Sequence, residues 1–219
     1  MLVAGVDEAG RGPVIGPMVM AIAVIEEKDL VLLQTMGVKD SKLLTHQKRY
    51  EIFNLLQEVC KIEYTVVSPK EIDAAVLSHS DNLNWLEARV AAKLIDKINC
   101  AKVILDCPSI NLETYGNYIK NKVKGEKTKK PKIIVEHKAD LNYLIVGAAS
   151  IVAKVKRDEE IEKIRVKIKK EIGSGYSSDP ITQKFVEENW NKKYDFFRKS
   201  WDTWKKHKSK FAQKSLGEY

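Results

Sequence analysis

The sequence predicts an α/β domain with a mixed sheet. Two observations carry this prediction. Short apolar or alternating segments, which are typical of strands, occur at residues 2–6, 14–25, 61–67, 101–105 and 132–136. Segments with apolar residues three and four positions apart, which are typical of amphipathic helices, follow several of them. The length of 219 residues fits one large domain, or one domain with a small appendage.

The first strand delivers two adjacent acids. The apolar run at residues 2–6 is followed by Asp7 and Glu8, and then by a Gly-Arg-Gly turn at residues 10–12. Two carboxylates at the end of a buried strand repel each other and cost stability unless a cation holds them. Successive side chains of a strand point to opposite faces, so a twist or bulge must bring both acids to one ion. From these two residues alone, a pair of solvated loop acids is an equally good interpretation.

The next segments carry start signals for helices. Residues 14–25 are largely apolar and predict a second strand buried on both faces. Thr45 is the predicted N-cap of one helix. Ser68, Pro69 and Glu71 form a predicted capping box, after which a second helix follows. The apolar stripes of the two helices are Ile52, Phe53, Leu56, Val59 and Cys60, and Leu83, Leu86, Val90, Leu94 and Ile98.

Two further acids follow buried strands. The strand at residues 101–105 ends at Asp106, and the strand at residues 132–136 leads to Asp140. A long helix is predicted from residue 141 until Gly173. An acid where a buried strand emerges can face a site at the carboxyl edge of the sheet. Taken singly, however, Asp106 is better explained as a helix cap or turn acid, and Asp140 as an N-cap.

The last part of the chain combines aromatic and basic residues. Between residues 184 and 214, ten Lys or Arg residues stand against four acids. Basic faces can follow phosphate backbones while the aromatic side chains pack inward. After Pro180 the sequence predicts a final helical segment that carries Phe185, Trp190, Phe196, Phe197, Trp201 and Trp204.

Composition favours a polyanionic partner. The formal net charge is +8 and the pI is near 9.2, which suits nucleic acid or an acidic membrane surface. The longest uncharged run, residues 12–25, is too short and too interrupted for a membrane helix, so we expect a cytoplasmic protein. Separately, we expect a monomer. Three cysteines without a CxxC pair and four scattered histidines indicate neither disulfides nor zinc. Metal chemistry would therefore use oxygen ligands.

Four strings of residues resemble the type 2 ribonuclease H family, and its archaeal members in particular. They are the opening LVAGVDEAGRGPVIGPMV, the EHKAD string with the following AASIVAK and Arg157-Asp158, the GSGYSSD at residues 173–179, and the RxSWxT pattern that begins at Arg198. The resemblance covers nearly the whole chain. It implies a ribonuclease H fold, with a catalytic domain at residues 1–172 and a helical substrate-binding subdomain at residues 173–219. Ser177 stands where the family usually has Pro, and this change should loosen the loop.

The resemblance also implies a metal site and an activity. The family's four acids fall on Asp7, Glu8, Asp106 and Asp140, and such hard oxygen ligands select Mg²⁺ or Mn²⁺. Two ions would then clamp the scissile phosphate. The expected enzyme hydrolyses the RNA strand of RNA/DNA hybrids and nicks 5′ of ribonucleotides embedded in duplex DNA. Its products would carry 5′-phosphate and 3′-hydroxyl ends.

Recognition of RNA depends on the 2′-hydroxyl. By resemblance, the backbone of Gly10, Arg11 and Gly12 bonds this hydroxyl, and Tyr176 stacks under the sugar of the following nucleotide. Lys42, in a DSK string similar to one in the family, is expected near the substrate backbone. Arg198 is also expected to bind substrate.

Three alternatives stay open at this point. Another two-metal nuclease on the same fold, such as a resolvase, would share the acids but not the GRG and GSGY strings. A non-catalytic binder of hybrids or structured RNA would rely on the positive charge alone. The spacing of Gln213, Leu216 and Tyr219 is similar to a sliding-clamp-binding box, although the chain ends before the second aromatic residue of such boxes, and a frayed tail is the better explanation.

Overall fold

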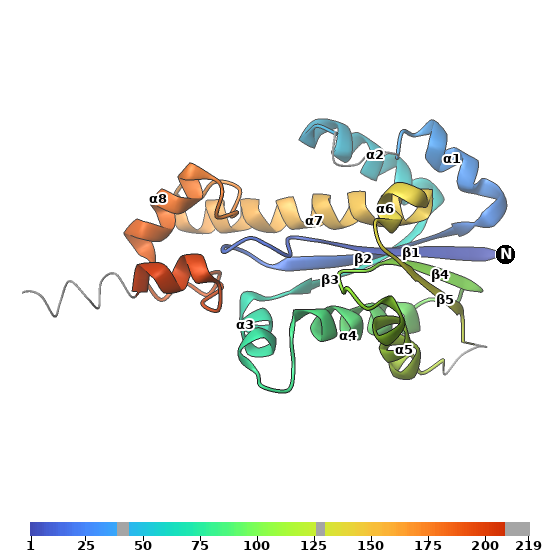
Figure 1. Ribbon diagram of the computed structural model, residues 1–219. Coiled ribbons are helices and arrows are strands. Elements are labelled where there is room, and N and C mark those ends of the chain that lie inside the picture. Colours follow the sequence, from blue (N-terminus) through green and yellow to red (C-terminus); the bar gives the residue numbers. More distant parts are fainter. Residues whose placement is uncertain (39–43, 126–129, 209–219) are drawn as a thin grey trace, which may run out of the picture. The chain divides into compact units, whose positions relative to one another are not determined.

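The computed structural model contains one five-stranded mixed sheet, as predicted (Figure 1). The structure describes residues 1–38, 44–125 and 130–208. Strand order is β3-β2-β1-β4-β5. β1 pairs antiparallel with β2 and parallel with β4, which pairs parallel with β5. The strands are β1 (Leu2–Ala9), β2 (Met18–Glu26), β3 (Lys61–Val67), β4 (Lys102–Asp106) and β5 (Lys132–Glu136).

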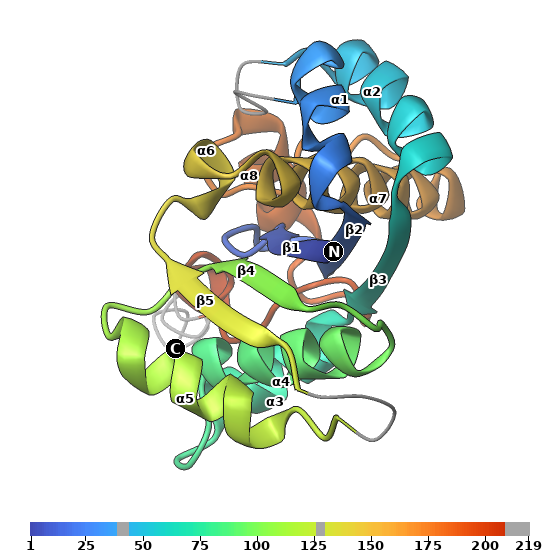
Figure 2. The same cartoon turned by 90° about the vertical axis from the view of Figure 1, so that its right-hand side faces the viewer.

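Helices cover both faces of this sheet. α4 and α5 lie on one face, and α1, α2 and α6 lie on the other (Figures 1 and 2). The helical elements are η1 (Glu27–Asp29), α1 (Leu30–Thr35), α2 (His46–Val59), α3 (Pro69–Leu77), α4 (Leu83–Asp96), α5 (Leu112–Lys122), α6 (Ala139–Asn142), α7 (Leu144–Ile168) and α8 (Pro180–Asn189). None of the helices in these described ranges combines the length and the apolarity that a bilayer crossing requires.

The chain divides into two compact units, each built from three segments. The first unit contains Met1–Ala9, Val19–Val66 and Leu83–Lys156, and its core includes Ile52, Leu56, Ile104, Val146 and Val152. The second unit contains Gly10–Met18, Val67–Asn82 and the chain from Arg157 onward. Its core is aromatic and β-branched, with Val14, Ile15, Ile161, Phe185, Phe196 and Phe197. The predicted division at residues 172 and 173 stays a prediction.

The two helix starts predicted at Thr45 and Ser68 are confirmed. The Thr45 hydroxyl accepts a hydrogen bond from the Lys48 N–H, which caps α2. Ser68 and Glu71 form the complete capping box ahead of α3, with Pro69 at its first position. These side chains bond backbone N–H groups that a helix start leaves without partners, which is why their spacing predicts a start so well.

The second strand begins later than the sequence predicts. β2 starts at Met18, whereas residues 14–25 were expected to be extended. Gly16 has a left-handed φ of 89°, and Pro17 has no N–H to donate to a neighbouring strand. Ile15 instead forms an isolated bridge with Phe197 in the second unit. The apolar residues before Met18 therefore belong to a different core from the strand that follows.

Predicted and observed helices differ in several places, and α1 was not predicted. Polar residues 78–82 separate α3 from α4, and their side chains bond nearby backbone as turn residues do. α5 was not predicted, although Asn111 caps it. The long helix expected from residue 141 until Gly173 is broken at Tyr143 and ends at Ile168. The C-terminal aromatic residues do not share one helix, because α8 ends at Asn189 and Phe196 and Phe197 lie in an irregular segment.

β1 approaches α7 at a glycine. A Cβ atom at Gly5 would collide with the backbone of Ile145 and Val146, and backbone cannot rotate away as a side chain can. This close approach places the start of α7 directly against the strand that carries the first acids.

We expect Gly5→Ala to lower the free energy of unfolding by about 2 kcal/mol or more, since overpacking against fixed backbone forces the helix from the sheet. Gly116→Ala is the matched control. Its Cβ would meet a single Val135 methyl at 3.2 Å, and alanine favours the helix. Urea denaturation of both variants measures the effect. Equal destabilisation would contradict this account of the β1–α7 contact.

Candidate active site

Three of the four predicted acids lie at the carboxyl ends of two neighbouring strands. Asp7 and Glu8 are near the end of β1, and Asp106 is the last residue of β4. β1 and β4 are parallel, with Val6 opposite Leu105. Asp7 and Asp106 therefore occupy the next position of each strand, and neighbouring strands are about 4.8 Å apart. The strand pairing thus gathers acids that are far apart in the sequence.

Asp7 experiences this crowding most strongly. Its side chain is only 6% exposed. Burial raises the pKa of Asp7 well above its usual range, and the nearby charges of Glu8 and Asp106 raise it further. Hydrogen bonds from the Ser150 side chain on α7 and from the Glu8 N–H, at 2.8 Å, act in the opposite direction. Without a cation, the ionised form of Asp7 is unfavourable here.

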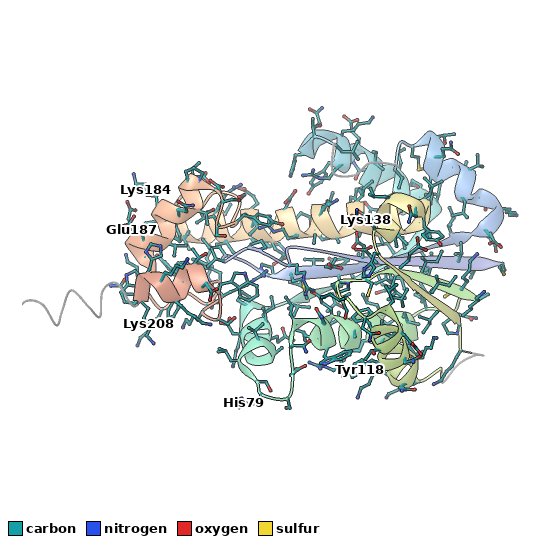
Figure 3. All side chains as sticks on the ribbon, viewed as in Figure 1. His79, Tyr118, Lys138, Lys184, Glu187 and Lys208 are labelled. Atoms are coloured by element: carbon teal, nitrogen blue, oxygen red, sulfur yellow. The ribbon has the colours of Figure 1, made fainter. Side chains whose placement is uncertain are left out.

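The fourth acid lies on a short helix whose start is bonded to Asp106. The Ala139 N–H donates to Asp106 Oδ1 at 2.7 Å. Asp140 is the next residue, in the first turn of α6, and is 8% exposed. The prediction that Asp140 is the N-cap is wrong, because Lys138 occupies that position with a left-handed φ of 56° (Figure 3). Asp106, from another strand, supplies the capping oxygen.

Glu136 is a functional candidate that sequence reasoning missed. It ends β5 opposite Asp106 in the parallel register. Its two carboxylate oxygens accept hydrogen bonds from Asn142 Nδ2 at 2.6 Å and from the Tyr143 hydroxyl at 2.7 Å. The bond to Glu136 also raises the pKa of Tyr143. Glu136 thus holds the end of α6, while Asp106 holds its start. The Glu of the EHKAD string was the available signal.

The acids fit a hard cation by charge and by donor type. All four offer carboxylate oxygens, the ligands that Mg²⁺ and Mn²⁺ prefer. A cation would also relieve the repulsion that disfavours ionised Asp7. Among the residues that the structure describes, no three His, Cys, Asp or Glu side chains already form a set that could hold a metal ion. The four acids therefore fit a cation by their chemistry and charge, and their side chains would have to rotate to bind it together.

In the second unit, the Gly-Arg-Gly turn and Tyr176 lie together. Gly10 has a φ of 81°, and a Cβ atom there would come within 2.8 Å of the Pro17 carbonyl oxygen. A Cβ atom at Gly12 would lie 3.7 Å from Cε1 of Tyr176, so the exposed edge of the turn faces the tyrosine ring. The Tyr176 side chain is 39% exposed. The two elements expected to read the sugar are thus brought together.

Hydrogen bonds fix the loop that carries Tyr176. The Ser174 N–H donates to Asp179 Oδ2 at 2.6 Å, and the Asp179 N–H donates to the Tyr176 carbonyl at 3.1 Å. Gln183 Nε2 donates to the carbonyl of Ser177, the position where Pro is usual in the family. These bonds hold the loop without the proline.

Arg157 supports the tyrosine, a role that sequence reasoning missed. This buried side chain donates to the Ser174 carbonyl, and its guanidinium carbon lies 5.2 Å from the centre of the Tyr176 ring. A Cβ atom at Gly10 would come within 3.1 Å of Arg157 Cγ. Arg157 therefore contacts both the turn and the tyrosine. Its place in the Arg157-Asp158 pair of the long signature was the only signal.

The remaining predicted site residues are buried or lie outside the described residues. Arg198 has no exposed side-chain surface, and its guanidinium donates to backbone carbonyls of the turn. A direct contact between Arg198 and substrate, as predicted, would require this side chain to become exposed. Lys42, Gln213, Leu216 and Tyr219 lie outside the described residues.

Comparison with known proteins identifies the family. The sequence profile described as Ribonuclease HII matches residues 4–204. Ribonuclease HII of Pyrococcus horikoshii is 44% identical over 220 residues, which cover 99% of this chain and 97% of that protein. The crystal structure of ribonuclease H2 from Pyrococcus horikoshii OT3 matches with a TM-score of 0.87 and 41% identity, over 97% of this chain and 100% of that one.

A second solved structure is the PCNA:RNase HII complex from Archaeoglobus fulgidus. It matches with a TM-score of 0.76 and 34% identity, over 85% of each chain. Sequence and fold agree over almost the full length. The chain therefore belongs to the ribonuclease HII family of metal-dependent endonucleases, which cleave the RNA of RNA/DNA hybrids.

Proposed function

We propose that this enzyme nicks duplex DNA 5′ of an embedded ribonucleotide, in addition to cleaving RNA/DNA hybrids, and leaves 5′-phosphate and 3′-hydroxyl ends. The observation that carries the catalytic part is the buried Asp7 beside Glu8 and Asp106. The observation that carries the specificity part is the contact between the Gly10–Gly12 turn and Tyr176. Gly10 follows Ala9, the last residue of β1, so the chain itself connects the two groups.

Asp7, Glu8, Asp106 and Asp140 would hold two Mg²⁺ or Mn²⁺ ions. When bound, such ions activate water for in-line attack on the phosphate and stabilise the leaving oxygen. The protein's own groups prepare the ligands. The Ser150 side chain and the Glu8 N–H orient Asp7 and favour its charged form. Asp106 and Glu136 together fix the short helix that carries Asp140.

The Gly10–Gly12 backbone and Tyr176 would recognise the sugar. A hydroxyl can be distinguished from a hydrogen only by groups that approach it closely, and glycine lets the main chain do so. The partly exposed Tyr176 ring would stack on the sugar of the next nucleotide, supported from behind by the Arg157 guanidinium. A deoxyribose there suits the ring, which favours cleavage at a junction from RNA to DNA.

Further parts of the proposal concern binding outside these groups. Lys42 would contact the substrate backbone, and residues 173–219 would form a substrate-binding subdomain. The Archaeoglobus fulgidus relative was solved with PCNA. This likeness and the spacing of Gln213, Leu216 and Tyr219 support binding of a sliding clamp by the C-terminal tail. If deletion of residues 214–219 leaves clamp binding unchanged, or if no binding exists, the tail has no such role.

The function is tested with a labelled DNA duplex that contains one ribonucleotide, beside an all-DNA duplex and an RNA/DNA hybrid. We expect a nick 5′ of the ribonucleotide with Mg²⁺ or Mn²⁺ and none with EDTA. Asp7→Asn should reduce the rate at least roughly a hundredfold, since it removes a ligand charge. Glu51→Gln is the control, because that side chain lies on α2, outside the proposed site and subdomain, and is 50% exposed. Cleavage of the hybrid alone would refute junction nicking, and binding without cleavage would indicate a non-catalytic protein.

The raised pKa of Asp7 predicts a pH-dependent stability in EDTA. Unfolding returns Asp7 to its ordinary value of 3.8, so the folded state holds the proton to higher pH. The contribution of Asp7 to the free energy of unfolding is therefore fully present below pH 3.8, and it is lost as pH rises through the folded pKa. Asp7→Asn cannot ionise, so we expect its advantage over the wild type to grow as pH rises from 4. Urea denaturation between pH 4 and 8 measures it, and a constant difference would contradict the shift.

We expect Tyr176→Ala to reduce cleavage of the single-ribonucleotide duplex roughly tenfold or more, since a lost stacking contact costs about 1 to 3 kcal/mol. Tyr176→Phe keeps the ring and should retain most of the stacking contribution. The increase in melting temperature that Mn²⁺ causes should be the same in both variants and in the wild type. Unchanged cleavage by Tyr176→Ala would exclude the stacking role.

A further inference from the structure

The carbonyl oxygens of the Gly-Arg-Gly turn are all bonded by two side chains of the C-terminal segment. Arg198 donates from Nη2 to the Gly10 carbonyl at 2.5 Å and from Nη1 to the Arg11 carbonyl at 2.8 Å. Trp201 Nε1 donates to the Gly12 carbonyl at 2.8 Å. Three consecutive peptide groups thus have their oxygens directed at one pair of side chains. All of these residues belong to the second unit.

Arg198 is built into this position as a fixed fork. Its Nε donates to the Gly16 carbonyl at 2.9 Å, so every nitrogen of the guanidinium bonds the chain around the turn. The side chain has no exposed surface, and its guanidinium carbon lies 4.9 Å from the centre of the Trp201 ring. A planar guanidinium presents several donors in fixed directions, whereas a lysine ammonium cannot reproduce this geometry.

The segment that carries Arg198 and Trp201 is itself held in place. Asp73 of α3 accepts hydrogen bonds from the Lys199 and Ser200 N–H groups, each at 2.9 Å, and from the Ser200 hydroxyl. On the other side, the Arg198 N–H donates to the Val14 carbonyl at 2.9 Å. The donors to the turn are therefore fixed by the protein before any nucleic acid binds.

This arrangement sets the direction of the turn's peptide groups. The peptide bonds are trans, so each C=O and the N–H of the following residue point in opposite directions. Drawing the Gly10 and Arg11 carbonyls toward Arg198 turns the Arg11 and Gly12 N–H groups to the opposite side. Gly12, which Trp201 holds, is exposed. The Gly12 N–H is therefore directed away from Arg198 on an exposed residue, where it suits a hydroxyl or phosphate oxygen. The carbonyl that Trp201 bonds precedes Pro13, which has no N–H, so Trp201 fixes the conformation of the turn and directs no donor of its own.

We propose that Arg198 and Trp201 are positioning residues that orient the Gly10–Gly12 peptide groups, and that they thereby determine the preference for a ribonucleotide. This inference rests on the proposed function, in which that backbone reads the 2′-hydroxyl. It replaces the expected direct contact of Arg198 with substrate by an action through the turn. The RxSWxT string is thus the structural complement of the GRG string, nearly 190 residues away in the sequence.

The test compares two tryptophans in full-length protein. Trp201→Phe keeps an aromatic ring and removes the N–H that bonds Gly12. Trp204→Phe makes the same change at a ring whose buried Nε1 has no hydrogen-bond partner among the residues described. Arg198→Lys keeps the charge and removes the fork. For each, we would measure KM for the single-ribonucleotide duplex and the inhibition constant of the matched all-DNA duplex. The inhibition constant divided by KM is the preference ratio, and thermal unfolding reports folding.

We expect Trp201→Phe to lower the preference ratio roughly threefold to tenfold, the equivalent of one net hydrogen bond, and Arg198→Lys to lower it further. Trp204→Phe should leave it unchanged. A merely structural role would lower kcat through loss of folded enzyme and would not change the ratio. If Arg198→Lys does not fold, Trp201→Phe alone decides.

Two results separate the inference from the function on which it rests. If the wild type prefers the ribonucleotide and Trp201→Phe keeps that preference, or if Trp204→Phe loses it equally, the positioning role is wrong and the proposed function stands. If the wild type shows no preference for the ribonucleotide over all-DNA duplex, the proposed function itself is wrong.

Discussion

The repulsion around the buried carboxylate of Asp7, near the end of β1, is the constraint on which this structure depends. Parallel pairing of β1 and β4 makes neighbours of Asp7 and Asp106, and burial raises the pKa of Asp7. A bound divalent cation would offset the unfavourable free energy of ionised Asp7, and it would also supply the chemistry of this metal-dependent family. The close approach of α7 at Gly5 and the bonds of Asp106 to α6 follow from holding these acids in place.

Under the proposed function, the second unit must hold a main-chain turn rigidly enough to recognise one hydroxyl group. Glycines allow the approach but cost conformational entropy and provide no side chain to fix themselves. The protein supplies that rigidity from elsewhere in the chain. Arg198 and Trp201 bond the carbonyls of the turn, and Arg157 lies against both Gly10 and the Tyr176 ring. Specificity in this account depends on side chains that the substrate does not touch.

Local signals predicted the elements well, and tertiary contacts explain what was missed. The caps at Thr45 and Ser68 were predictable because a cap is completed within four residues. Asp140 was misplaced as an N-cap because the true capping oxygen comes from Asp106, 33 residues before the Ala139 N–H that it bonds. The roles of Glu136 and Arg198 likewise depend on partners that strand pairing and the C-terminal segment bring near. The four acids were found through family resemblance, since each alone has an ordinary explanation.

If the acids around Asp7 hold a divalent cation, Mg²⁺ should stabilise the folded protein at neutral pH, and thermal unfolding with and without Mg²⁺ measures this effect. A ligand that binds only the folded state raises the melting temperature with its concentration. We expect a saturable increase for the wild type and for Glu51→Gln, and little or none for Asp7→Asn. An equal increase in Asp7→Asn would show that Mg²⁺ binds elsewhere and would contradict the account.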